Sequence, residues 1–130
     1  MIDQIGSIIL WYGDNAKSAT IDLIMNAKDK LVTLNYTLGE TLAEAQTDFN
    51  KKYFIRKITI AKKEAYHINS GEAIGRAKII AAEECEFQFK EELEAEAEAN
   101  KYEILHRQAN RVVEAMTQRI SVLKREYETY

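Results

Sequence analysis

Apolar residues recur at helical spacing along most of the chain, and the clearest series lies near the C-terminus. Its steps are three or four residues, and its members are Tyr102, Leu105, Ala109, Val112, Met116, Ile120, Leu123 and Tyr127. At 100° per residue these side chains fall within an arc of about 80°. We call this narrow series the C-terminal seam, and it is typical of a coiled-coil contact. We expect either a helix over 15–36 or another subunit to cover it.

The first residues of the chain predict a short helix. Ile2, Ile5 and Ile9 have helical spacing, although the apolar run 8–12 is also typical of a short strand. Periodicity does not separate the two structures over so short a segment. We favour a helix that ends at Gly13.

A second helix is predicted over 15–36, with Asp14 and Asn15 as its N-cap residues. Thr37 and Glu40 follow it with capping-box spacing, and a glycine lies between them. This pattern predicts a break, after which a new helix begins near residue 40.

The helix predicted over 40–67 carries two apolar stripes. One stripe consists of Leu42, Ala45, Phe49, Tyr53 and Ile60, and the other of Phe54, Ile58, Ala61 and Ala65. Two stripes indicate a helix that is covered from two sides.

The clearest turn in the chain is Asn-Ser-Gly-Glu at 69–72, whose first and last residues again have capping-box spacing. Beyond it, no proline and only one further glycine interrupt the helical pattern, so a long helix is predicted over 71–129. The stretch 91–100 is rich in alanine and glutamate and has one large apolar residue. It is the place where we expect any break in this helix.

These elements predict an all-α fold with one domain over 1–130. Its centre is a long antiparallel helical hairpin, formed by 40–67 and the coiled-coil-like helix 71–129. Residues 1–36 add a short N-terminal helical element. The chain contains no proline and is 46% hydrophobic, which excludes a collagen-like chain and simple disorder.

Two charge blocks of opposite sign stand out. Residues 51–63 contain six basic residues and no acid, whereas 83–98 contain eight glutamates and one lysine. One interpretation is that the hairpin brings the blocks together. A reversal near Ser70 would then place Arg56 opposite Glu84 and Lys52 opposite Gln88. This charge matching is the interpretation that we favour, because it would also help to set the helix register.

A second interpretation is that each charge block is a binding surface for another molecule. The basic residues with Tyr66 are typical of a nucleic-acid interface, in which an aromatic ring stacks on a base. The nucleic-acid candidates are Lys51, Lys52, Arg56, Lys62, Lys63 and Tyr66. The acidic block is the alternative interface, for a basic site on another protein. Its candidates are Glu83, Glu84, Glu86, Glu91, Glu94 and Glu98.

The sequence holds no recognisable catalytic or metal-binding pattern. His67 and His106 are far apart and belong to no His-x-x-x-His or Glu-x-x-His pair. The single cysteine, Cys85, lies among glutamates, which disfavour a reactive thiolate. We therefore predict that the protein is not an enzyme, needs no cofactor and holds no metal. One cysteine and no long apolar run predict a cytoplasmic protein that does not bind membranes.

The residues from about 42 to 126 resemble small helical proteins that bacteriophages and prophages encode among replication and recombination functions. The features that carry the resemblance are Tyr53, Arg56, Ala61-Lys62-Lys63, Gly71-Glu72-Ala73, Ala77-Lys78 and the closing run 109–124. The resemblance implies an accessory role beside single-strand-annealing or replication proteins, in the host cytoplasm. It implies no catalytic residues.

Three functions follow as hypotheses. The first is an oligomeric accessory scaffold of DNA recombination that binds single-stranded DNA or a DNA-recombination protein. The second is an inhibitor of a host defence protein, acting by direct contact or by nucleic-acid mimicry. The third is a helical oligomer that binds a small nucleotide. All three include a homo-oligomer.

Overall fold

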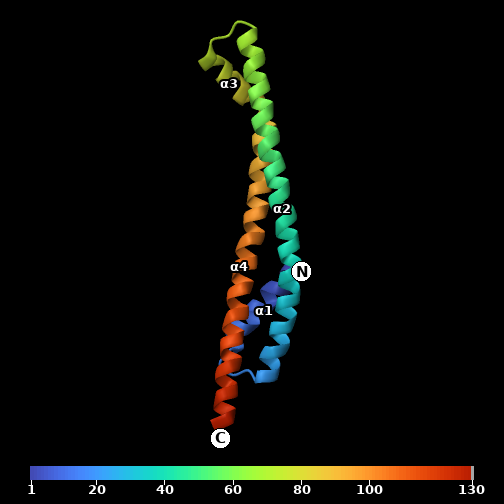
Figure 1. Ribbon diagram of the computed structural model, residues 1–130, viewed down its shortest axis with the longest axis vertical. Coiled ribbons are helices and arrows are strands. Elements are labelled where there is room, and N and C mark those ends of the chain that lie inside the picture. The colour runs from blue at the N-terminus through green and yellow to red at the C-terminus, as the bar shows by residue number, and fades with distance from the viewer. Residues whose placement is uncertain (130) are drawn as a thin grey trace. The chain divides into compact units, whose positions relative to one another are not determined.

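The computed structural model describes residues 1–129, which form four α-helices (Figure 1). They are α1 (Ile2–Asn15), α2 (Ile21–Asn69), α3 (Ile74–Glu84) and α4 (Glu86–Thr129). The long helices α2 and α4 pack antiparallel. The predicted all-α fold, with a helical hairpin and a short N-terminal helix, is confirmed. None of these helices is long and apolar enough to span a membrane.

The described chain divides into two compact units. Unit 1 consists of residues 1–42 and 102–129, and unit 2 of residues 43–101. Unit 1 therefore contains α1, the first part of α2 and the last part of α4. Unit 2 contains the rest of α2 and α4 together with α3.

The N-terminal helix confirms the helical alternative, but it runs two residues past Gly13 and ends at Asn15. The predicted N-cap residues of the next helix are therefore wrong. Asn15 donates its side-chain amide to the Trp11 carbonyl (2.8 Å) within α1. Thr20 takes the capping role, because its hydroxyl accepts the Leu23 N–H (3.3 Å) at the start of α2.

The predicted break near 36–40 is wrong, because α2 is continuous from Ile21 to Asn69. Thr37 does not cap a helix, and its hydroxyl lies 3.5 Å from the Thr33 carbonyl one turn earlier. Gly39 lies inside the helix against His106 of α4. A capping-box sequence with a glycine therefore does not end this helix, whose packing against α4 continues through it.

The turn at 69–72 is confirmed. Gly71 has φ +101°, a conformation that glycine adopts without strain. The expected capping box does not form, because Ala73 is the N-cap residue of α3. Glu72 instead pairs with Arg76 at 3.3 Å.

The helix predicted over 71–129 is divided, but at Cys85 and not within 91–100. The Cys85 N–H donates to the Ala82 carbonyl (3.1 Å), and its φ and ψ of −102° and 15° end α3. The stretch 91–100 continues without a break in α4. Its alanines and glutamates are strong helix formers, which explains this continuity.

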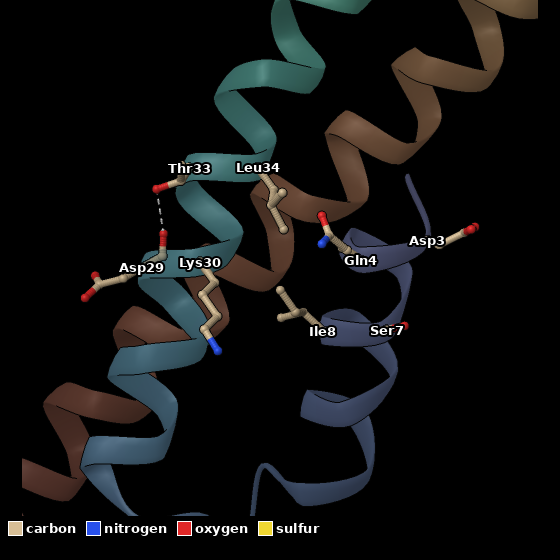
Figure 2. A pocket seen from close by; sticks show the side chains of 8 residues that line it. All are labelled: Asp3, Gln4, Ser7, Ile8, Asp29, Lys30, Thr33 and Leu34. Carbon is tan, nitrogen blue, oxygen red and sulfur yellow. Dashed lines mark hydrogen bonds between the residues drawn. The ribbon is translucent and has the colours of Figure 1, made fainter. Parts of the chain in front are cut away.

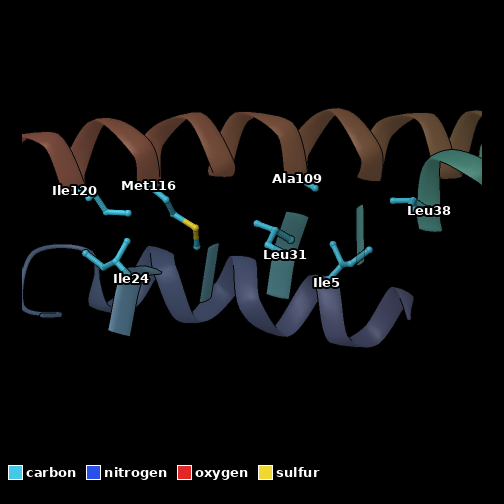
Figure 3. Packing of buried hydrophobic residues seen from close by; sticks show 7 residues of the cluster. All are labelled: Ile5, Ile24, Leu31, Leu38, Ala109, Met116 and Ile120. Carbon is cyan, nitrogen blue, oxygen red and sulfur yellow. The ribbon is translucent and has the colours of Figure 1, made fainter. Parts of the chain in front are cut away.

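Unit 1 has a core of large apolar side chains from three helices (Figure 3). The fully or almost fully buried members are Ile5, Ile24, Leu31, Leu38, Ala109, Met116 and Ile120. Tyr102, Leu105, Val112 and Leu123 pack against them. The chain's own α1 and α2 thus cover the C-terminal seam, with Tyr127 (82% exposed) as the exception. Of the two covers that we expected, a helix of the same chain or another subunit, the first is the one found.

Candidate partner-binding face

The inner side of α2 in unit 2 is fixed by an ion pair with α4. Arg56 donates from Nε and Nη2 to the two carboxylate oxygens of Glu92, at 2.7 and 3.2 Å. The guanidinium also lies against the rings of Tyr53 and Phe89. This hydrogen bonding lowers the pKa of Glu92 and raises that of Arg56. The pair is almost buried, since Glu92 is 9% exposed.

A second ion cluster joins the end of α2 to the end of α3. Lys63 Nζ lies 3.1 Å from one carboxylate oxygen of Glu84, and His67 Nε2 lies 2.6 Å from the other. Hydrogen bonds from Lys63 and then His67 lower the pKa of Glu84. His67 thus serves as a hydrogen-bond partner of Glu84 near the turn.

These contacts divide the predicted nucleic-acid candidates into two groups. Lys52 pairs with Asp48 (3.4 Å), and Arg56 and Lys63 point inward to glutamates. The charge blocks therefore do meet, but the predicted register is wrong: Arg56 meets Glu92 and not Glu84. Lys52 does not meet Gln88, whose buried Oε1 has no hydrogen-bond partner in the part of the chain that the structure describes.

The remaining candidates lie on the opposite side of α2. At 100° per residue, Lys51 and Lys62 fall within 40° of Ile58, whereas Arg56 and His67 lie more than 150° away. We define the outer face of α2 as Lys51, Phe54, Ile55, Ile58, Ala61, Lys62 and Ala65, with Lys57 and Tyr66 at its edges. Phe54, Ile55, Ile58 and Tyr66 are each more than half exposed.

This outer face contradicts one prediction. Its members Phe54, Ile58, Ala61 and Ala65 are the second apolar stripe, which we expected to be covered. They are exposed, and no segment of residues 1–129 packs over Phe54 or Ile58. Between Lys51 and Lys63 this helix contains no acid. The result is an open apolar surface with positive charge.

The acidic candidates are also divided. Glu84 is paired, and Glu91 is half-buried. Glu83, Glu86, Glu94 and Glu98 are exposed, and Glu94 approaches Lys90 at 4.0 Å. We define the outer face of α4 as Glu86, Lys90, Leu93, Glu94 and Ala97. Leu93 is 64% exposed, so this face also combines apolar surface with charge.

Two residues of this region, Glu92 and Lys57, were not predicted from the sequence to have the roles described here. Glu92 was counted in the acidic block but not recognised as the partner of Arg56. Its spacing to Ala95 and Ala99, which are also buried, is the signal that marks it as inward-facing. Lys57 is absent from the predicted nucleic-acid candidates, although its ammonium lies 4.9 Å from the centre of the Tyr53 ring.

Unit 1 contains an open groove between α1 and α2 (Figure 2). Ile8 and Leu34 point toward one another across it, and Gln4 and Lys30 reach into it, whereas Asp3 and Asp29 point away.

No group of three potential metal ligands occurs among residues 1–129. His67 lies in unit 2 and His106 in unit 1, where His106 Nδ1 bonds the Asn35 side-chain oxygen at 2.8 Å.

No protein-family model, curated protein sequence or solved structure matches the chain.

Proposed function

We propose that this protein is a non-enzymatic helical scaffold that binds a partner protein through the outer face of α2. The observation that carries the proposal is the exposure of Phe54, Ile55 and Ile58 at 59%, 55% and 52% on one helix face. Exposed apolar side chains gathered in one patch are typical of a protein interface. Ile58 lies three residues after Ile55 and four after Phe54, a spacing that suits a partner helix.

The charge of this face indicates the charge that a partner would carry. Lys51, Lys57 and Lys62 flank the apolar side chains, and none of the three has an ion-pair partner within residues 1–129. An acidic amphipathic segment would complement both properties at once. The resemblance to phage accessory proteins suggests DNA recombination or replication as the setting, with a recombination protein as the partner.

Affinity capture with matched variants tests this proposal. Ile58→Ser places a polar group in the outer face, and Val32→Ser makes the same kind of change on the half-exposed Val32 of α2 in unit 1. Ile58→Ser should reduce the capture of specific proteins from a bacterial lysate about tenfold, because it removes a central apolar contact. Val32→Ser should leave capture unchanged. Equal capture by all three proteins would contradict the proposal.

Single-stranded DNA is a second candidate, favoured by the exposed Tyr66 ring (67%) beside Lys62. A ring and lysines on one face suit base stacking and phosphate contact. Three phosphate contacts would give a slope of about −2 for log affinity against log salt. Fluorescence anisotropy with a labelled oligonucleotide should then show weaker binding by a Lys51→Gln, Lys62→Gln variant. Salt-independent binding, or none, would exclude this candidate.

The inhibitor hypothesis has less support. It requires a continuous acidic surface, but Glu84 and Glu92 are paired with Lys63 and Arg56 within the chain. Nucleic-acid mimicry depends on a regular series of exposed acids. The four exposed glutamates of the candidate set provide only part of such a series.

A further inference from the structure

We infer that unit 2 binds a second copy of this chain, with the outer face of α2 in one copy docked on the outer face of α4 in the next. The inference rests on the proposed role of the outer face of α2 as a docking surface. It adds that one occupant of this surface is a second copy of the chain, and that this copy makes the contact through the outer face of α4.

The two faces have opposite charge. The outer face of α2, with its edges, carries Lys51, Lys57 and Lys62 and no acid. The outer face of α4 carries Glu86 and Glu94, with Lys90 as its one cation. Docking one face on the other would bring these lysines near glutamates, an arrangement that favours specific association.

Both faces also expose apolar side chains that unit 2 leaves uncovered. Phe54 and Ile58 stand on one face and Leu93 on the other, each more than half exposed. Ala61, Ala65 and Ala97 lie among them and allow two helices to approach closely. A contact between the faces would therefore have an apolar centre and a charged rim, as specific protein interfaces do.

The positions of the faces determine the kind of assembly. Arg56 and Glu92 mark the inner sides of α2 and α4, so the outer faces of these helices point away from each other. Each copy then offers two different surfaces, and the contact is head to tail. A symmetric contact between two α2 faces is disfavoured, because it would bring Lys51 and Lys62 of each copy together.

Two variants, each with one face disabled, test this contact by light scattering after size exclusion. Lys51→Glu with Lys62→Glu disables the outer face of α2, and Leu93→Asp disables that of α4; the two disabled faces are both acidic, so they cannot pair with each other. Wild type should exceed the mass of one chain at about 0.05 M salt and dissociate at about 0.5 M. Each variant alone should be monomeric, with self-association at least about tenfold weaker. Circular dichroism confirms that each variant remains helical.

Mixing the two variants gives the decisive result. Each retains one intact face, so an equimolar mixture should form a complex with the mass of two chains and not grow further. A monomeric wild type, a mixture that stays monomeric, or an α4 variant that still dimerises alone would overturn the inference. The proposed function is judged separately, by whether Ile58→Ser loses proteins that Val32→Ser still captures.

Discussion

The two units of this protein use the same pair of helices in opposite ways. In unit 1, Ile5, Ile24, Leu31, Leu38 and Met116 are fully buried. In unit 2, the buried apolar residues are Ala77, Ala81, Cys85, Ala95 and Ala99, and all are small. The large apolar side chains of unit 2 are half-buried, such as Tyr53 and Phe89, or exposed, such as Ile58 and Leu93.

The difference follows from what packs against the hairpin. In unit 1, α1 supplies a third helix, so Ile5 meets side chains from both α2 and α4 (Figure 3). In unit 2, α3 is attached mainly through small residues and the Glu84 ion cluster. Two helices alone bury only one stripe each. The third helix therefore lets unit 1 bury large apolar side chains, whereas unit 2 buries small ones.

The largest expected effect concerns the core of unit 1. Leu31→Ala should lower the free energy of unfolding by about 2–5 kcal/mol, because it leaves a cavity among Ile5, Ile24 and Met116. Ile58→Ala, on the same helix in unit 2, should change it by no more than about 0.5 kcal/mol. Urea unfolding followed by circular dichroism measures both. Equal losses would show that Ile58 is already buried in the protein in solution.

The ion pair of unit 2 should give the next largest effect. Glu92→Leu leaves the Arg56 guanidinium nearly buried without its partner, which should cost about 1–3 kcal/mol. Adding Arg56→Met should recover most of this loss, because two apolar side chains replace the pair. Glu96→Leu, at an exposed position of the same helix, serves as the control. A double variant as unstable as Glu92→Leu would mean that packing, and not the unpaired charge, causes the loss.

Acid should weaken the same contacts more modestly. The pKa values of Glu84 and Glu92 are lowered in the folded protein, so their stabilising effect is full above the ordinary glutamate pKa. It is lost as the pH falls from about 4.3 through the lower folded values. Thermal unfolding between about pH 5 and about pH 3 should show this loss. The Arg56→Met, Glu92→Leu variant should show a smaller loss, and an identical one would exclude this pair as a cause.

The fold follows from the sequence where periodicity alone decides it. The spacing of the C-terminal seam and the Asn-Ser-Gly-Glu turn were enough to predict a helical hairpin. The end of α3 was missed because neither glycine nor proline marks residues 84–86. The end of α3 coincides with a packed position, because Ala77, Ala81 and Cys85 lie one turn apart and all three are buried.

That missed helix end explains the wrong charge register. A hairpin that reverses at Ser70 without interruption pairs Arg56 with Glu84. Because α3 forms a separate helix and α4 begins at Glu86, the partner of Arg56 lies eight residues later, at Glu92. The exposed stripe on α2 was found as a pattern, but its exposure was not. Helical spacing shows which side chains share a face and does not show whether anything covers that face.

The smallest effect tests how closely α2 and α4 approach in unit 1. A Cβ on Gly39 would lie 3.4 Å from His106 Cε1, which is an ordinary van der Waals contact. Gly39→Ala should therefore raise stability by about 0.5–1 kcal/mol through helix propensity. Gly71→Ala should lower it by about 1 kcal/mol, because φ +101° at that position strains any side chain. If thermal unfolding showed Gly39→Ala to be destabilising, the helices would approach too closely there for a methyl group. The tight packing of unit 1 would then extend to the end of the unit, which would widen its contrast with unit 2.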